Sequence, residues 1–193
     1  MRMRRRTRTV AVAVAVAVVA VLGTFGVRQL RHADAGSAAT VTQTRRVLPA
    51  AQRPAAPVLD GRTLTGARLS TADWQGKIIV VNFWGSWCAP CRKEAPALRR
   101  ISAESYAQGV RFVGVDIRDS QANGSSFEKD HRITYPSFDD PDATLSLRFH
   151  ALAPQATPST YVFDRMGRIA AVFFGATTYD ELNSAVELVV EKG

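Results

Sequence analysis

Two cysteines are the residues of this chain whose type and spacing most directly indicate chemistry. Cys88 and Cys91 are the only cysteines in 193 residues, and Ala89 and Pro90 separate them. A zinc site needs two further good ligands, and the three histidines of the chain offer no close pair. Covalent haem attachment needs His directly after the second Cys, where this chain has Arg92. We therefore expect no metal and no cofactor at this pair.

The remaining choice is between a structural and a redox-active disulfide. A bridge across so short a loop removes only about 2 kcal/mol of unfolded-chain entropy, far less than a bridge across a long loop. A purely structural role is therefore a weak explanation. The sequence favours a redox-active pair that opens and closes during a reaction.

The residues around the pair predict how it is positioned. The run Ile78 to Trp84 is almost wholly apolar, which predicts a strand covered on both faces. It leads directly into the cysteines and then into a helical stretch that ends near Ser105. The pair then lies at a helix N-terminus, where unpaired amides and the helix dipole stabilise an anion. We expect Cys88 to be the attacking thiolate and Cys91 to resolve the mixed disulfide.

Aromatic and imino residues surround the predicted site. Pro90 suits the first turn of a helix and keeps the pair rigid. Trp84 and Trp87 are candidates for the walls of the site, and Trp87 in particular for contact with substrate. Ordinary core packing is an equally good explanation for either tryptophan.

The rest of the chain from Val58 onward alternates predicted strands and helices, which indicates an α/β fold with a partly parallel sheet. Ser70 is a predicted N-cap for one turn of helix. Gly167 is the turn residue of a predicted hairpin. The other predicted elements are a strand at 111–117, helices at 120–131 and 143–149, hairpin strands at 160–163 and 168–174, and an amphipathic helix at 179–191.

The net charge of +8 belongs to the N-terminus and not to the predicted domain. Residues 1–31 hold seven Arg and no acidic residue, whereas residues 58–193 hold 15 Lys and Arg against 16 Asp and Glu. Such a domain has no electrostatic footprint for a phosphate backbone. Nucleic-acid binding is excluded on this ground.

The N-terminal third predicts a membrane anchor. Residues 10–27 are uncharged and would span about 27 Å as a helix, close to the thickness of a bilayer core. Five Arg precede this span, so residues 1–9 are expected inside and the rest of the chain outside. Residues 28–57, rich in Ala, Thr and Pro, predict a flexible linker, and 58–193 the folded domain. A cleaved signal peptide is the alternative, with a small-residue site at Ala33-Asp34-Ala35.

The run from Val80 to Pro96, which reads VVNFWGSWCAPCRKEAP, resembles the TlpA/ResA/CcmG group of membrane-anchored thioredoxin-like proteins. The resemblance extends from about Val58 to the C-terminus and includes the segments at 114–116, 157–161 and 164–167. It implies a thioredoxin-like fold, with a central mixed sheet flanked by helices behind a single transmembrane helix.

The resemblance also implies roles for residues far from the cysteines. A cis peptide is implied before Pro158, where the backbone of Thr157 would pair with the substrate chain. Glu94 matches the acidic residue that follows the second Cys in this group, and it stands one helical turn beyond Cys91. It either exchanges a proton with Cys91 or is a first-turn carboxylate that the helix dipole favours. Asn82 replaces the buried Asp of cytosolic thioredoxins, which makes Glu94 the substitute acid.

Together these features predict a protein thiol-disulfide oxidoreductase of the cell membrane, single-pass, with its catalytic domain outside. Ala89-Pro90 resembles the dipeptide of reducing thioredoxins, which favours a reductase. An extracytoplasmic reductase needs a transmembrane thiol electron donor, and its protein substrates could include apocytochrome c. The alternatives are a tethered binding module with idle cysteines and a peroxiredoxin-like antioxidant. Gly85 argues against the latter, whose motif has Thr or Ser there.

Overall fold

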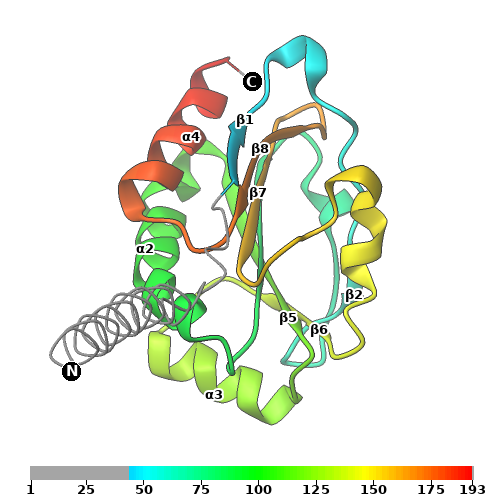
Figure 1. Cartoon of the computed structure of the whole chain (residues 1–193), viewed down its shortest axis with the longest axis vertical. Helices are drawn as coiled ribbons and strands as arrows, with labels where there is room; N and C mark the ends of the chain where they lie inside the picture. The colour runs from blue at the N-terminus through cyan, green and yellow to red at the C-terminus, as the bar shows by residue number, and fades with distance from the viewer. Residues whose placement is uncertain (1–43, 193) are drawn as a thin grey trace, which may run out of the picture. The chain divides into compact units, whose positions relative to one another are not determined.

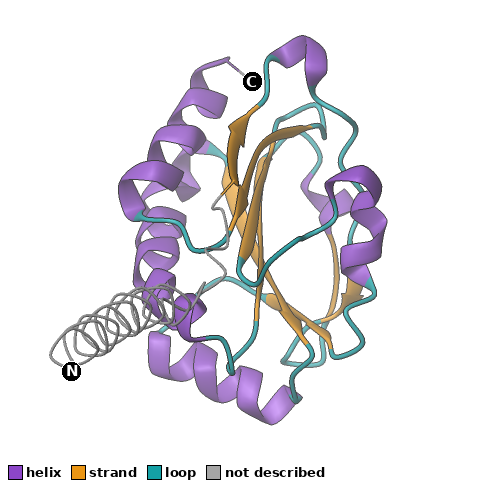
Figure 2. Cartoon of the chain, viewed as in Figure 1, coloured by secondary structure: helices purple, strands orange, loops and turns teal. Residues whose placement is uncertain are grey.

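A computed structural model describes residues 44–192, in which helices cover a mixed six-stranded sheet (Figures 1 and 2). The strand order is β1-β8-β7-β4-β5-β6. The β4, β5 and β6 strands are parallel, whereas β7, β8 and β1 are added by antiparallel pairing. The strands are β1 (Thr44–Val47), β4 (Ile78–Trp84), β5 (Val110–Ile117), β6 (Ser137–Asp140), β7 (Ser159–Phe163) and β8 (Ile169–Phe174), with β2 (Asp60–Arg62) and β3 (Arg68–Ser70) in a separate hairpin.

The β4 strand lies inside the sheet, and all seven of its residues are buried. On one face of the strand, Ile78 and Val80 pack in a cluster with Leu98 of α2 (Ala89–Ser105) and Leu182 of α4 (Tyr179–Lys192). Its odd-numbered side chains face a second cluster that includes Phe83 and Phe149. A strand covered on both faces accounts for the unbroken apolar run, so this prediction is confirmed.

Several local predictions are confirmed by the backbone. The Ser70 hydroxyl accepts a hydrogen bond from the Ala72 amide and caps the 3-10 helix η2 (Thr71–Trp74). Gly167 has φ 69° in the turn between β7 and β8, a conformation that glycine adopts without steric cost. The helix predicted at 120–131 is α3 (Gln121–His131), capped by Ser120.

The predicted linker is wrong for its last residues. Residues 44–57, expected to be solvated, include β1, which pairs antiparallel with β8, and the short 3-10 helix η1 (Ala50–Gln52). Leu48 is buried, and Ala55 forms a bridge with Arg168. This segment adds an edge strand to the sheet, because its backbone finds partners that no local pattern reveals.

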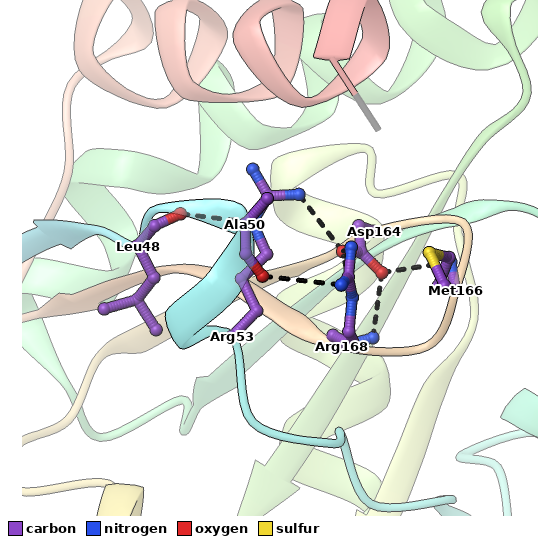
Figure 3. A network of polar contacts seen from close by, with 6 residues as sticks. All are labelled: Leu48, Ala50, Arg53, Asp164, Met166 and Arg168. Carbon is purple, nitrogen blue, oxygen red and sulfur yellow. Dashed lines mark hydrogen bonds and ion pairs between the residues drawn. The ribbon is translucent and has the colours of Figure 1, made fainter.

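An ionic network fixes this segment to the β7–β8 hairpin (Figure 3). The buried carboxylate of Asp164 accepts hydrogen bonds from the guanidinium groups of Arg53 and Arg168, at 3.1 and 2.9 Å. It also accepts from the backbone amides of Met166 and Arg168. Burial alone would raise the pKa of Asp164, but the hydrogen bonds from Arg168 and Arg53 hold it below its ordinary value. The charge is therefore compensated.

Two elements differ from the sequence prediction on the other side of the sheet. The strand β6 was not predicted, because its sequence Ser-Phe-Asp-Asp is short and polar. The helix expected at 143–149 is the 3-10 helix η4 (Leu145–Leu152), interrupted where His150 has φ 46°. A further 3-10 helix, η3 (Tyr106–Gln108), directly follows α2.

The predicted membrane span lies outside the described residues, as do residues 1–9 and 28–43. Among the helices formed by residues 44–192, none has the length and apolar character needed to cross a bilayer.

Candidate active site

The two cysteines lie at the start of α2, after the turn that follows the carboxyl end of β4. They are joined by a disulfide, and both are buried in this oxidised state. Cys88 is the N-cap residue of α2, and its Sγ atom accepts a hydrogen bond from the Cys91 amide at 3.2 Å. Pro90 occupies the first turn, where its missing N–H costs no helical bond. The geometry places the negative charge of a Cys88 thiolate against helix amides.

The loop before β7 faces the cysteines from the neighbouring strand. The Thr157–Pro158 peptide bond is cis, which confirms that expectation. The carbonyl oxygen of Thr157 lies 3.6 Å from the Cys88 Sγ atom. The structure therefore brings Cys88, Thr157 and Pro158 together, although 69 positions separate the first two in sequence. No comparable contact joins Cys91 to this loop among the described residues.

Glu94 is buried on α2, with a side chain that is 2% exposed. Its Oε1 atom accepts a hydrogen bond from Asn82 Nδ2 and its Oε2 atom one from the Thr177 amide, both at 2.9 Å. Burial raises the pKa of Glu94 to about 7, and the bonds from Thr177 and Asn82 oppose this rise. A solvated first-turn carboxylate does not fit this environment. The group can take up and release a proton near neutral pH.

Asn82 connects Glu94 to the sheet. Besides Glu94, its amide donates to the Thr160 hydroxyl at 2.9 Å, so one side chain joins β4, α2 and β7. An amide can hold this position without charge, whereas the carboxylate beside it titrates. Glu94, which the sequence analysis names as the acid of this region, is thus the carboxyl group that Asn82 contacts, and its role in catalysis stays a prediction.

The two tryptophans play different structural parts. Trp84 is buried and stacks on Phe127 of α3, with ring centroids 4.4 Å apart, in the cluster that contains both cysteines. Trp87 is 51% exposed, and its indole N–H donates to the Ile117 carbonyl at 3.2 Å. A Cβ at Gly85 would lie 2.4 Å from the Trp87 ring nitrogen, so glycine allows the indole to lie across the loop. Trp84 is therefore part of the core, whereas the Trp87 ring lies at the surface next to the cysteines' loop.

Sequence reasoning missed Asp119, which positions the loop before Cys88. One of its carboxylate oxygens accepts a hydrogen bond from the Ser86 amide at 2.7 Å, and the other accepts from Ser120 at 2.8 Å. Burial would raise the pKa of Asp119, but these bonds lower it, so the carboxylate stays charged. Its place just after β5 was the available signal, since the carboxyl ends of parallel strands meet at one edge.

Asp116 is a second acid that sequence reasoning gave no role. It pairs in register with Trp84 and is 1% exposed, and neither carboxylate oxygen makes a hydrogen bond within the described residues. Burial, helped by the charge of Asp119 and other acids, raises its pKa to about 8. Gly124 of α3 lies directly over it, because a Cβ there would be 2.0 Å from a carboxylate oxygen.

Across residues 44–192, no group of three or more His, Cys, Asp or Glu side chains is arranged to hold a metal ion. What the arrangement can do is thiol-disulfide exchange. It combines a disulfide at a helix N-terminus, a backbone edge beside it at Thr157 and a buried acid that titrates near neutrality.

The sequence is similar to known thiol-disulfide oxidoreductases and thioredoxin-like proteins. A model of the AhpC/TSA family matches residues 53–172. The thiol-disulfide oxidoreductase ResA of Bacillus subtilis is 29% identical over 64% of this chain and 68% of its own length. The thioredoxin-like protein YneN of the same organism is 29% identical over 69% of this chain and 77% of its own.

Solved structures agree with these sequences. A DsbF homologue from Corynebacterium diphtheriae aligns with a TM-score of 0.71 and 32% identity, over 77% of this chain and 95% of that one. A secreted thiol-disulfide isomerase from Corynebacterium glutamicum aligns with a TM-score of 0.73 and 28% identity, over 79% and 95%. The thioredoxin-like fold expected from the sequence is confirmed.

Proposed function

Because this chain belongs to the AhpC/TSA family and is a protein thiol-disulfide oxidoreductase, we propose that it reduces protein disulfides outside the cytoplasm from a membrane anchor. The observation that carries the chemistry is the position of Cys88, at the N-cap of α2 and 3.6 Å from the Thr157 carbonyl oxygen. A sulfur at that point is stabilised as an anion and lies beside a backbone edge on which a substrate can pair.

The reaction begins from the reduced pair. The Cys88 thiolate attacks one sulfur of the substrate disulfide, which forms a mixed disulfide and releases the other substrate sulfur as a thiolate. That thiolate takes a proton from solvent. The carbonyl of Thr157, the ring of Pro158 and the exposed face of Trp87 hold the substrate chain during this step.

Resolution uses Cys91 and Glu94. The Cys91 thiol gives its proton to the Glu94 carboxylate and attacks the Cys88 sulfur, which restores the Cys88–Cys91 disulfide and releases the second substrate thiolate. That thiolate also takes its proton from solvent. Glu94 suits this task because its pKa of about 7 lets it accept a proton at neutral pH and release it afterwards. Two electrons pass from the enzyme to the substrate.

The oxidised enzyme must then be reduced by another dithiol. Outside the cytoplasm such electrons come across the membrane, so we propose a transmembrane thiol protein as the donor.

Location and substrate are further parts of the proposal. The relative from Corynebacterium glutamicum is described as secreted, which supports a domain outside the cytoplasm whether the N-terminal segment is retained or cleaved. A protease added to cells stripped of their wall should release the domain from the membrane fraction. Apocytochrome c is one protein substrate to test, because its two haem-binding thiols must be reduced before attachment.

The direct test measures the reduction of disulfides by this protein. The wild type should reduce insulin disulfides with a dithiol donor, and Cys88→Ser should abolish the activity. The reduction potential decides direction, with a value near that of thioredoxin, about −270 mV, expected for a reductase. A potential near about −120 mV would instead indicate an oxidant. Consumption of hydrogen peroxide faster than reduction of insulin would contradict the proposed substrate class.

A further inference from the structure

The segments around Cys88 carry an excess of positive charge. Those that contact this residue or the loop before it are residues 85–93, 117–119 and 154–160. They contain one acid, Asp119, and three cations, which are Arg92, Lys93 and Arg118. Residues 58–193 as a whole hold 15 Lys and Arg against 16 Asp and Glu. The excess is therefore local to the reactive end of the domain.

Arg92 is bonded to the loop that precedes Cys88. It follows Cys88 by four positions, so its side chain starts one turn further along the same face of α2. Its Nη1 atom donates a hydrogen bond to the Ser86 carbonyl oxygen at 2.5 Å. The guanidinium group thus reaches back along the first turn of the helix to a residue two positions before Cys88. Arg92 is exposed, so its charge is also accessible to a bound substrate.

Arg118 lies between two residues that contact the same loop. The carbonyl oxygen of Ile117 accepts a hydrogen bond from the Trp87 indole at 3.2 Å. The carboxylate of Asp119 accepts one from the Ser86 amide at 2.7 Å. Arg118 itself has φ 52°, a left-handed conformation that is uncommon for a residue with a side chain. The bonds on either side fix its backbone next to the loop before Cys88, and the residue is exposed.

These positive charges are not neutralised by the protein itself. Within residues 44–192, none of the three cations forms an ion pair. Asp119 is engaged by the amides of Ser86 and Ser120. Positive charges near the N-terminus of a helix oppose its dipole, so the stability of α2 does not explain Arg92 and Lys93. A charged partner that docks there does explain them.

We propose that Arg92, Lys93 and Arg118 form a positively charged rim that recognises acidic residues beside the disulfide of a protein substrate. The inference rests on the proposed function, because it names the class of substrate that docks at Cys88. The exposed ring of Trp87 contacts the apolar part of the substrate chain, and the rim contacts its Asp and Glu side chains. Such exposed charge pairs mainly raise the rate of association, and salt weakens them.

The test compares three cyclic peptides that differ only in the residues flanking their single disulfide, which are two Asp, two Asn or two Lys. Tryptophan fluorescence gives the rate constant at which each peptide oxidises the reduced protein. Each value is divided by that for the same peptide with dithiothreitol, which corrects for the intrinsic reactivity of the disulfide. In about 0.1 M salt the Asp peptide should react about fivefold faster than the Asn peptide, and the Lys peptide about fivefold slower. In about 0.5 M salt both ratios should fall below about twofold.

Single variants assign the preference to the rim. Arg118→Gln should lower the preference for the Asp peptide from about fivefold to about twofold, and Arg118→Lys, which keeps the charge, should retain most of it. Lys93→Gln should act in the same direction as Arg118→Gln. Arg132→Gln is the matched control, because Arg132 is also exposed and has φ 54°. It lies at the other end of α3, about 16 Å of helix away, and should keep the wild-type preference.

The outcomes separate this inference from the proposed function. Equal corrected rates with the Asp and Asn peptides in the wild type would overturn the inference and leave disulfide reduction in place. So would an Asp preference in both Arg118→Gln and Lys93→Gln that equals that of Arg132→Gln. Failure of the wild type to reduce any of the three peptides, when dithiothreitol reduces all of them, would overturn the proposed function and the inference together.

Discussion

Replacing Glu94 with Gln should remove a pH-dependent part of the stability that the structure assigns to this carboxyl. The pKa of Glu94 is about 7 against an ordinary value of 4.5, and burial is the main cause. The folded state therefore binds this proton more tightly than the unfolded state. The resulting stabilisation is fully present below pH 4.5 and is lost as pH rises through about 7.

The size of the effect follows from the shift. Each pKa unit corresponds to about 1.4 kcal/mol, so between pH 5 and pH 8 the wild type should lose roughly 2–3 kcal/mol of unfolding free energy through Glu94. Glu94→Gln cannot titrate, and its loss between the same two pH values should be smaller by that amount. Asp116, with a pKa of about 8, acts in the same direction in both proteins. The comparison is therefore between variant and wild type.

The assay is urea unfolding of the oxidised protein at pH 5 and pH 8, in which the cysteines are bonded and do not titrate. Glu191→Gln, on the exposed end of α4, is the matched control and should keep the wild-type difference. An equal pH dependence in the wild type and Glu94→Gln would refute the reasoning, because it would mean that this carboxyl titrates alike in the folded and unfolded chain.

Three further substitutions test other parts of the structure. Asp116→Asn should raise the unfolding free energy at pH 9 by roughly 1–3 kcal/mol, with a smaller gain at pH 5, because the buried carboxylate is charged only above about pH 8. A variant that is less stable than the wild type at pH 9 would contradict this. Asp164→Asn should lower the free energy of unfolding by about 3–5 kcal/mol at pH 7, because Arg53 stays buried without its charge partner. This loss should shrink below pH 4, where the wild-type carboxylate becomes protonated, and urea unfolding at both pH values measures it. Trp87→Ala should raise KM for protein disulfides roughly tenfold and leave the melting temperature and the reaction with a small disulfide unchanged, since the ring is exposed. An equal loss of activity with the protein and the small disulfide would point to a role in the chemistry.

The sequence predicted the centre of this fold because the signals there are local. The apolar run of β4, the cysteines and the helix that follows are contiguous, and their pattern alone defines a strand, a turn and a helix N-terminus. The hairpin turn at Gly167 and the cap at Ser70 also depend on neighbouring residues only. These elements needed no knowledge of the rest of the chain.

The misses depend on contacts between distant segments. The segment of β1 has an ordinary linker composition. It becomes a strand because it pairs with the edge of β8, and because Arg53 after it forms an ion pair with Asp164. The polar β6 strand is fixed by pairing with β5. In the same way, no role was predicted for Asp119, because its bond to Ser86 joins residues 33 positions apart.

The candidate site was predicted where a family resemblance supplied the long-range pairing. Spacing alone indicated a redox pair at Cys88 and Cys91, whereas Thr157 and Pro158 came from the resemblance, and the structure brings that loop to Cys88. The burial of Glu94, which decides how it titrates, has no signature in the sequence. It arises because α2, β4 and the loop at Thr177 meet around it.

The most direct test of the central claim is to identify the cysteine that forms the bond with substrate. Reduced Cys91→Ser and Cys88→Ser proteins are mixed separately with a peptide disulfide at pH 7, and the products are measured by intact-mass spectrometry over time. The account predicts rapid formation of a stable peptide adduct on Cys88 in Cys91→Ser, and little or none on Cys91 in Cys88→Ser. A faster adduct on Cys91 would contradict the assignment of Cys88 as the nucleophile.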